Sequence, residues 1–418
     1  MLSVDEALQM VLSRAVPRAP EVRPADEALG LVLAEDVTSD VDSPPHDKSL
    51  VDGYAIVAAE LADGAADFEL LEEVTAGAVP SRAVTRGHTT RIMTGAPIPE
   101  GADAVVMVER AELSPTANGL PRVRLQETAK PGQNIMRRAV SMRRGDVVLR
   151  AGAALRAVEL GVLAEVGRLE VRVIDRPRLA VLSTGNELVP PTQLPGPGQI
   201  RNSNGPMVTA AAQAAGAAAV NLGIARDEPA ALRAAIARGL EHDVLAISGG
   251  VSAGVLDLVP GVLAELGVEQ VFHKVNLKPG KPLWFGVRAQ QGGGNTLVFG
   301  LPGNPVSSLV CFELFVRPAI ARLAGRGAAS LGETSATLTA DFLNRSDRAT
   351  YFPARLAVAE QGTTVEPLRW QGSGDLRTLV EANALACFPP GPLQFRAGDC
   401  IRVLRLASAG WHGHVARE

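Results

Sequence analysis

Apolar runs and helical patterns alternate along residues 176–325. We expect strands where the runs are short and rich in Val, Ile and Leu, and helices where apolar residues recur every three or four positions. The predicted strands cover 179–182, 218–224, 244–247, 270–275, 283–287 and 296–299, and the predicted helices cover 207–215, 229–240, 256–266 and 306–323. Strands that alternate with helices through short loops are typical of a doubly wound, mainly parallel sheet. The sequence therefore predicts an α/β domain over residues 176–326.

The segments on either side of this domain predict further parts of a multidomain protein. Residues 45–145 contain short β-like runs between Gly/Pro turns, which is typical of a small β-rich domain inserted into another. We expect residues 1–44 and 146–175 to form one discontinuous, elongated N-terminal domain. Its helical patterns include one that opens with a capping box, in which Ser3 is followed three residues later by Glu6, and a short one at 25–29. From residue 327 the pattern is β-like again, which predicts a small C-terminal β-domain over 327–408 and a tail over 409–418.

Composition narrows the class of protein. Hydrophobic residues make up 46% and charged residues 21% of the 418 residues, and the net charge is −4, so we expect a soluble protein that binds no nucleic acid. No apolar stretch is long enough to cross a membrane. Asp5 and Glu6 stand where a signal peptide would carry positive charge, and the three cysteines form no CxxC pair, so we expect a cytoplasmic location. The absence of HExxH and GxxxxGK[ST] motifs disfavours a zinc hydrolase and a P-loop NTPase.

The glycine-rich segment after residues 244–247 is the strongest chemical signal. It runs from Ser248 to Asp257 as SGGVSAGVLD, between a predicted strand and a predicted helix. Glycines let the backbone approach a ligand closely, and a helix N-terminus favours an anion, so the segment predicts an oxyanion site. Its candidate binding residues are Ser248, Gly249, Gly250, Ser252 and Gly254. Asp257 is unusual at an anion site and suggests that a divalent cation joins the anion.

Three acidic residues follow predicted parallel strands. Glu187 follows the first strand through Thr184 and Gly185, Asp227 follows the second, and Asp257 follows the third. Ligands of open α/β sheets bind beyond the carboxyl ends of the strands, so we expect these acids to converge if the strands are neighbours. The alternative is that each acid is a helix cap or a solvated loop residue.

Two further loops complete a predicted phosphate-binding set. Residues 300–305 form a Gly/Pro loop with Pro302, Gly303 and Asn304, and Ser307 follows in the first turn of the next helix. Residues 274–281 carry Lys274, Lys278 and Lys281, the last two at the ends of a Pro-Gly pair that suits a type II turn. A solvated hairpin would explain the lysines equally well, but together they suit a tetrahedral oxyanion.

The complete set of motifs resembles the molybdopterin molybdenumtransferase family, MoeA, which includes the gephyrin E domain. The matching stretches are DKSLVDGYAI at 47–56, RIMTGAPIPEGADAVVMVE at 91–109, PGQNIMRR at 131–138, LSTGNELV at 182–189, SGGVSAG at 248–254, KVNLKPGKP at 274–282 and GLPGNPVSS at 300–308. A looser match in the C-terminal part involves Arg348 and Ser373.

The resemblance implies an enzyme that inserts molybdate into adenylylated molybdopterin and releases AMP, with Mg²⁺ assisting. It also implies a homodimer with an active site between subunits, and it leaves room for a molybdopterin adenylyltransferase and apo-molybdoenzymes as partners. Glu187, Asp227 and Asp257 would be the acids of the nucleotide and metal site. The three lysines would hold phosphate or molybdate, Asp52 and Thr94 would come from the β-rich domain, and Arg348 and Ser373 from the C-terminal domain.

One position departs from the family. Where the family has a Gly-Glu-Asp-Ile motif, this chain has Ala139, Val140, Ser141 and Met142, so the acid expected at Ser141 is absent. The sequence therefore leaves two alternatives to the transferase: a molybdopterin adenylyltransferase, and a divergent molybdopterin-binding paralogue that does not insert the metal.

Overall fold

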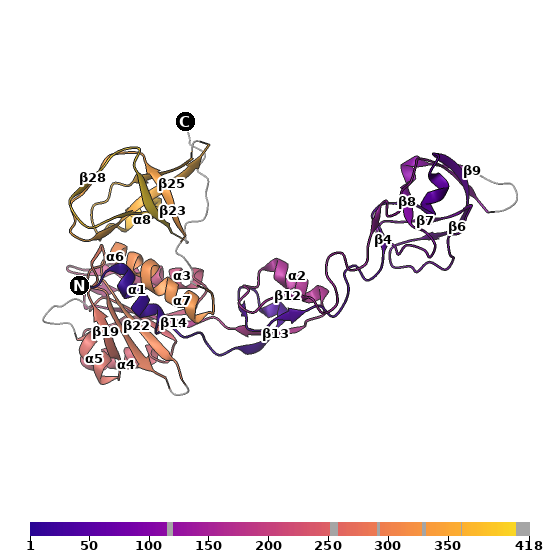
Figure 1. Ribbon diagram of the computed structural model, residues 1–418. Coiled ribbons are helices and arrows are strands. Elements are labelled where there is room, and N and C mark those ends of the chain that lie inside the picture. The colour runs from indigo at the N-terminus through magenta and orange to yellow at the C-terminus, as the bar shows by residue number, and fades with distance from the viewer. Residues whose placement is uncertain (115–119, 251–257, 291–292, 328–331, 361, 407–418) are drawn as a thin grey trace. The chain divides into compact units, whose positions relative to one another are not determined.

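The computed structural model describes residues 1–114, 120–250, 258–290, 293–327, 332–360 and 362–406 (Figure 1). The chain divides into two compact units. The larger unit contains Met1–Ala34, Gly152–Arg156 and Glu170–Glu418, and the smaller unit contains Glu35–Ala151 and Ala157–Leu169. The finer division into four domains and a tail stays a prediction.

A six-stranded sheet with the order β17-β14-β18-β22-β21-β19 forms the centre of the larger unit. Its first four strands are mutually parallel, and β21 and β19 are antiparallel to their neighbours. The reason is local: β21 ends at Ala289 and β22 begins at Asn295, so the connection is too short for a helical crossover. The prediction of a mainly parallel sheet is confirmed. The strands are β14 Arg178–Thr184, β17 Ala218–Ala225, β18 Val244–Ser248, β19 Glu269–His273, β21 Trp284–Ala289 and β22 Asn295–Leu301.

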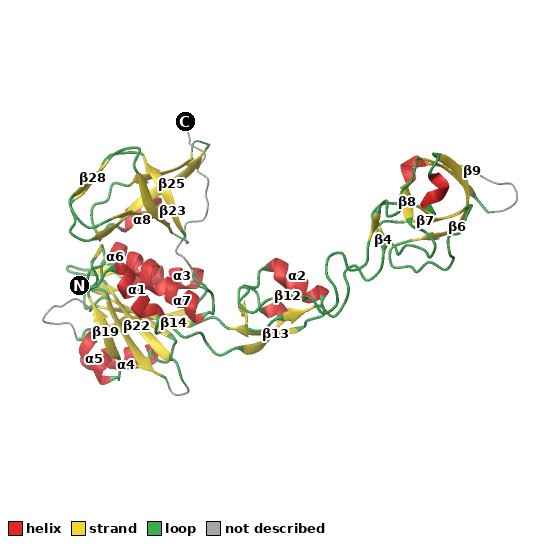
Figure 2. Ribbon diagram, viewed as in Figure 1, coloured by secondary structure: helices red, strands yellow, loops and turns green. Residues whose placement is uncertain are grey.

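Helices cover both faces of this sheet (Figure 2). Alternate residues of β14 face opposite ways: Leu179 belongs to the apolar cluster that contains residues of α1, α3, α6 and α7, whereas Ala180 belongs to the cluster that contains residues of α4 and α5. The sheet is therefore doubly wound, as the sequence predicts. The helices are α1 Val4–Leu12, α3 Asn204–Ala214, α4 Pro229–Gly239, α5 Val259–Glu265, α6 Pro305–Cys311 and α7 Arg317–Leu323. Phe312–Val316 forms a π-helical turn between α6 and α7, which the periodicity of the sequence does not reveal.

The N-terminal residues of the larger unit are tied to the α/β domain. The capping box that opens α1 is present, because Ser3 accepts from the Glu6 backbone and Glu6 accepts from the Ser3 backbone. Arg18 then pairs with the nearly buried Asp243 at 2.7 Å, just before β18. A three-stranded sheet with the order β1-β13-β2 follows, made of β1 Glu21–Pro24, β2 Val32–Leu33 and β13 Glu170–Ile174. The helical pattern at 25–29 is only a 3₁₀ turn, Ala25–Glu27.

Five strands of the C-terminal part close into a barrel. The pairings run β25-β26-β23-β29-β27 and back to β25, so the sheet has no open edge among these five. The short strand β20, Leu277–Lys278, comes from the α/β domain and pairs with the start of β25. The barrel strands are β23 Glu333–Leu338, β25 Ala349–Ala359, β26 Gly362–Pro367, β27 Ala384–Phe388 and β29 Cys400–Arg405; β24 Phe342–Asn344 pairs with β28 Leu393–Phe395, and α8 covers Leu376–Glu381.

The smaller unit is built on a second six-stranded sheet, with the order β8-β5-β7-β6-β10-β9. Its strands are β5 Gly53–Ile56, β6 Ala65–Val74, β7 His88–Ile92, β8 Ala104–Met107, β9 Ala111–Ser114 and β10 Arg122–Gln126. Two short ladders join β4 Lys48–Ser49 to β11 Ile135–Met136, and β3 Val37–Thr38 to β12 Val147–Leu149; α2 covers Ala157–Glu165. Across the described parts of both units, every helix is too short or too polar to span a membrane.

Candidate active site

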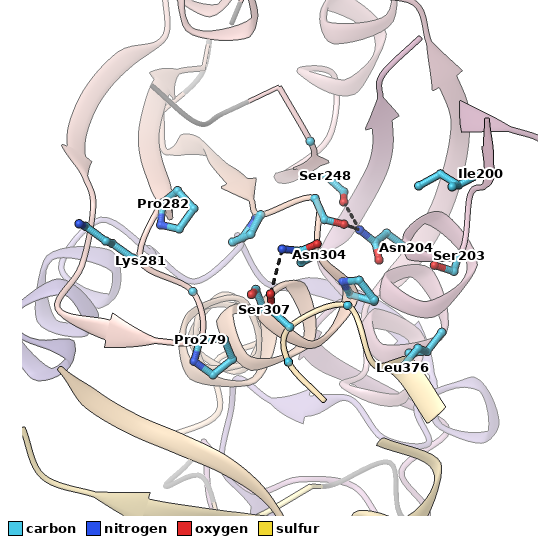
Figure 3. Close-up of a pocket in the computed structure, with 18 of the residues that line it drawn as sticks. Ile200, Ser203, Asn204, Ser248, Pro279, Lys281, Pro282, Asn304, Ser307 and Leu376 are labelled. Atoms are coloured by element: carbon cyan, nitrogen blue, oxygen red, sulfur yellow. Dashed lines mark hydrogen bonds between the residues drawn. The ribbon is translucent and has the colours of Figure 1, made fainter. Parts of the chain in front are cut away.

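A cavity of about 1100 Å³ lies beyond the carboxyl ends of β14, β18 and β22 (Figure 3). Parallel strands open their carboxyl ends to the same side, so the loops that follow them share this space. Most of the predicted binding residues that the structure describes line it. They are Thr184, Glu187, Ser248, Gly249, Lys278, Lys281, Pro302, Gly303, Asn304, Ser307, Arg348 and Ser373.

The loops after β14 and β18 fit together only because glycines lie between them. Gly249 has φ +92° and Gly250 has φ +63°, both in the left-handed region. A Cβ at Gly249 would lie 2.5 Å from the Thr184 carbonyl oxygen, and one at Gly250 would lie 2.7 Å from the Thr184 hydroxyl oxygen. The backbone of the glycine loop is therefore packed directly on the neighbouring loop. Ser252, Gly254 and Asp257 lie outside the described residues.

Glu187 projects into the cavity from the loop after β14. Its carboxylate occupies the space beside Gly185, where a Cβ would lie 2.5 Å from one carboxylate oxygen and 2.6 Å from the other. Gly185 thus makes room for the acid and does not itself line the cavity. Close by, Thr184 is buried, and its hydroxyl oxygen has no hydrogen-bond partner among the described residues.

Asp227 lies next to this loop but outside the cavity lining. Its carboxylate accepts from the Asn186 backbone at 3.3 Å, and its own backbone donates to the Asn186 side chain at 3.1 Å. These contacts join the loops that follow β14 and β17, whereas the convergence of Glu187, Asp227 and Asp257 stays a prediction. Among the described residues there is no group of three His, Cys, Asp or Glu side chains arranged to hold a metal ion.

Four cationic residues among those described line the cavity: Lys278, Lys281 and Arg348 on one side, and Arg201, whose Nε donates to the Gln193 carbonyl at 3.0 Å. The predicted turn at 278–281 is present with Gly280 at φ +120°, but the Lys278–Pro279 peptide is cis, which a type II turn does not contain. Arg348 donates to the Leu277 carbonyl at 3.2 Å, so the barrel and the lysine turn are joined at this wall. Lys274, at φ +74°, is not among the lining residues.

The first turn of α6 forms the floor between these walls. Asn304 is its N-cap residue, and the Asn304 side chain donates to the Ser373 hydroxyl at 2.9 Å. Ser373 also accepts from the Val306 backbone through its carbonyl, at 3.1 Å. These contacts explain why Ser373, far away in the sequence, lies with Ser307 on the same cavity. The buried hydroxyl of Ser308 in this turn has no partner within the described residues.

Asp52 and Thr94 lie together in the smaller unit. The Thr94 backbone and hydroxyl both donate to Asp52 Oδ1 at 2.7 Å. These two hydrogen bonds stabilise the carboxylate and hold the pKa of Asp52 below its usual range.

Sequence reasoning missed several lining residues. Asn202, Ser203 and Asn204 precede or begin α3, and Phe352 and Trp370 come from the barrel. The triplet Asn-Ser-Asn before an apolar helical pattern could have indicated these residues, because Asn and Ser favour the first positions of a helix. Phe352 and Trp370 carried no signal, because only the closure of the barrel brings them to the cavity.

The fold and the cavity define a multidomain α/β protein with a large cavity whose lining includes several cationic side chains. Three sequence profiles match the chain: the MoeA N-terminal region (domain I and II) over residues 2–167, a probable molybdopterin binding domain over 180–322, and the MoeA C-terminal region (domain IV) over 335–406. The chain belongs to the MoeA family of molybdopterin molybdenumtransferases.

Individual relatives agree with this assignment. Molybdopterin molybdenumtransferase from Staphylococcus epidermidis is 33% identical over 97% of this chain and 96% of its own length, and that from Staphylococcus aureus is 32% identical with the same coverage. Two structures of the molybdopterin biosynthesis MoeA protein from Pyrococcus horikoshii match with TM-scores of 0.79, identities of 32% and 28%, and coverage of 97% of this chain and 99% or 100% of theirs. The chain is thus an enzyme of molybdenum cofactor biosynthesis, with molybdate and adenylylated molybdopterin as the substrates that the family activity implies.

Proposed function

We propose that the cavity of the larger unit holds adenylylated molybdopterin and molybdate during metal insertion. The observation that carries this proposal is the meeting of Lys278, Lys281 and Arg348 with the glycine loop in one space of about 1100 Å³. Backbone N–H groups, hydroxyls and three cations together suit phosphate and molybdate oxygens. A protein nucleophile is not needed, because cleavage of the phosphoanhydride is favoured by charge neutralisation at the leaving phosphate.

The individual roles follow from position. Lys278, Lys281 and Arg348 neutralise the oxyanions, and Ser248, Ser307 and Ser373 supply hydroxyl groups. Thr184, Pro302, Gly303 and Asn304 shape the wall against which the ligand packs. Lys274, Ser252 and Gly254 keep the roles that the resemblance implies for them.

Mg²⁺ is part of this proposal, with Glu187, Asp227 and Asp257 as its protein ligands. Glu187 supports it because its carboxylate lies at the cavity, and Asp227 supports it because it contacts the same loop through Asn186. Mg²⁺ commonly binds one or two carboxylates and completes its octahedral shell with water and substrate phosphate, so a three-residue protein cage is not required. When bound, the ion would stabilise the negative charge that develops on the released AMP.

We further propose that the enzyme is a homodimer in which Asp52 and Thr94 reach the partner's cavity. Helix α2 supports an interface, because it is apolar yet buries only Leu163; Val158 is 68% exposed, and nearby Leu169 is 80% exposed. Apolar side chains grouped on a surface mark association sites. In the cytoplasm, a molybdopterin adenylyltransferase would supply the substrate and apo-molybdoenzymes would receive the product.

Replacing a cavity cation tests the binding proposal. Lys281→Ala should lower kcat/KM for AMP release from adenylylated molybdopterin about 10- to 100-fold, since a hydrogen bond to a charged group is lost. Arg238→Ala, which removes an exposed cation at the end of α4 on the other face of the sheet, is the matched control. Equal kinetics for both variants would refute the assignment of the cavity.

The proposed role of Glu187 as a Mg²⁺ ligand is tested by the dependence of AMP release on Mg²⁺ concentration. Glu187→Gln should raise the Mg²⁺ concentration required for half-maximal AMP release, because a neutral amide is a poorer ligand than a carboxylate. The exposed Glu269→Gln on β19 provides a comparison with the same chemical change. An unchanged Mg²⁺ dependence in Glu187→Gln would remove Glu187 from the metal site without affecting the binding proposal.

A further inference from the structure

Asn204, at the start of α3, connects the loops that form the cavity. Its side-chain nitrogen Nδ2 lies 2.7 Å from Ser248 Oγ and 2.6 Å from the Gly303 carbonyl oxygen. Figure 3 shows the Asn204 amide directed at Ser248, with a dashed line for the hydrogen bond between them. One side chain therefore holds together the ends of β18 and β22 and the beginning of α3.

The chemistry of the contacts fixes the orientation of the Asn204 amide. The same amide atom touches both partners, and a peptide carbonyl can only accept a hydrogen bond. That atom must therefore be the nitrogen, with one N–H directed to Gly303 and the other to Ser248. An oxygen in this place would oppose the Gly303 carbonyl oxygen at 2.6 Å.

This orientation determines what the Ser248 hydroxyl can do. Since Ser248 Oγ accepts from Asn204, its own proton remains available to donate in another direction. Ser248 lines the cavity, and within the described residues its hydroxyl donates to no other group. Its proton can therefore serve an oxyanion in the cavity.

The surroundings of Asn204 indicate that the amide is placed for these two hydrogen bonds. Asn202 Oδ1 accepts from the Ser183 hydroxyl at 3.1 Å and from the Gly205 backbone at 3.0 Å, which fixes the first residues of α3. Asn204 has an exposed fraction of only 7%, yet its Oδ1 has no hydrogen-bond partner among the described residues. A buried unsatisfied acceptor lowers stability, so a residue chosen for packing alone would not be an asparagine.

We propose that Asn204 is a positioning residue, which directs the Ser248 hydroxyl proton to a phosphate or molybdate oxygen of the substrates. The proposal rests on the proposed function of the cavity, since it needs an oxyanion there. It adds a residue that acts through Ser248 and never touches the reacting atoms itself.

A double-mutant cycle tests this coupling. The affinities for AMP and for molybdate are measured separately by calorimetry in the full-length protein, so that the cycle also identifies which oxyanion Ser248 serves. Ser248→Ala should weaken binding of that ligand about 10-fold, and Asn204→Ala should do the same in the otherwise unchanged protein. In the Ser248→Ala background, Asn204→Ala should have less than about a 2-fold effect.

A comparison of ligands gives a readout that a purely structural role would not produce. Adenosine carries no oxyanion, so Asn204→Ala should leave its affinity unchanged while it weakens binding of the ligand that Ser248 serves. A cavity that had lost its shape would instead bind adenosine, AMP and molybdate less well together.

The outcomes separate this proposal from the proposed function. Equal effects of Asn204→Ala with and without Ser248, or an equal loss of affinity for adenosine in Asn204→Ala, would overturn the positioning role. Wild-type affinity of Ser248→Ala for both ligands would also overturn it, even where Lys281→Ala still weakens binding and the cavity assignment stands. If Lys281→Ala and Ser248→Ala both bind normally, the proposed function fails as well. Near-UV circular dichroism confirms that each variant is folded.

Discussion

The cavity loops of the larger unit and the arginine segment of the smaller unit, residues 137–144, are stabilised in opposite ways. The cavity loops rely on close backbone packing: Gly249 lies against Thr184, and Ser248 and Thr184 are almost completely buried. Geometry of this kind changes little with salt or pH. It suits a site that must hold a large ligand in one orientation.

The arginine segment relies instead on exposed charges. Arg137 pairs with Asp47 at 2.5 Å and Arg138 with Asp42 at 2.6 Å, while the two arginine side chains remain 55% and 65% exposed. The Arg138 backbone also donates to Asp47 at 2.8 Å. Exposed ion pairs are screened by salt and contribute little stability, so this segment tolerates changes of sequence that the cavity loops do not. The departure from the family at Ser141 falls in this tolerant region.

Of the substitutions that test this comparison, Gly249→Ala should have the largest effect on stability. Its Cβ would lie 2.5 Å from the Thr184 carbonyl, and its φ of +92° is strained for alanine, so we expect a loss of about 2–4 kcal/mol in unfolding free energy. Gly198→Ala is the control, since Gly198 has φ +74° but no atom within 4 Å of the added Cβ; it should cost only about 1 kcal/mol. Denaturant unfolding of both variants provides the measurement, and similar losses would contradict a tightly packed cavity loop.

Ser141→Asp tests whether the arginine segment affects molybdenum insertion. Ser141 is exposed and its backbone donates to the Ser43 carbonyl at 3.0 Å, so the new side chain needs no rearrangement. We expect a several-fold rise in molybdenum insertion, because the resemblance to the family predicts a carboxylate here, with a change in stability below about 0.5 kcal/mol.

The readout for Ser141→Asp is reconstitution of an apo-molybdoenzyme, with Ser141→Asn as the uncharged control. Lower or unchanged insertion in Ser141→Asp would show that this chain does not need a carboxylate at position 141 for molybdenum insertion.

Ala139→Gly should increase stability slightly. Ala139 has φ +58°, a left-handed conformation that costs alanine about 1–2 kcal/mol and that glycine adopts without this cost. Part of the gain is lost because glycine has greater freedom in the unfolded chain, so we expect a net increase of up to about 1 kcal/mol. Ala151→Gly, an exposed alanine whose φ is not positive, should be neutral or destabilising in the same denaturation assay.

Thr94→Val should produce the smallest effect, and one that depends on pH. The folded pKa of Asp52 lies below its unfolded value, so the Thr94 hydrogen bonds add stability above the unfolded pKa, and this stability is lost as the pH falls through the folded pKa. The difference in unfolding free energy between wild type and Thr94→Val should therefore be present at neutral pH and disappear in acid. The exposed Thr128→Val gives the control; a difference that stays constant with pH would argue against the Asp52 contact.

Much of the α/β domain could be predicted because its signals are local. Apolar runs located β14, β17, β18 and β22, and the capping box located α1, since both depend on residues close together in the chain. The paired glycines at 249 and 250 also indicated a backbone that enters the left-handed region, as both do. Prediction was weaker for the barrel and for the 3₁₀ turn at Ala25–Glu27, where short segments obtain their structure from distant partners.

The sequence by itself determined the order of the strands and helices, the glycine loop, the lysine turn and the family, because each is carried by residues within one segment. Only the tertiary structure decided that Arg348 meets Leu277, that Ser373 meets Asn304, and that Asn204 joins Ser248 to Gly303. These contacts link residues 44 to 99 positions apart, and they exist because particular strands became neighbours in the sheet. Which strands pair is settled by burial of the whole core, a property that no single segment contains.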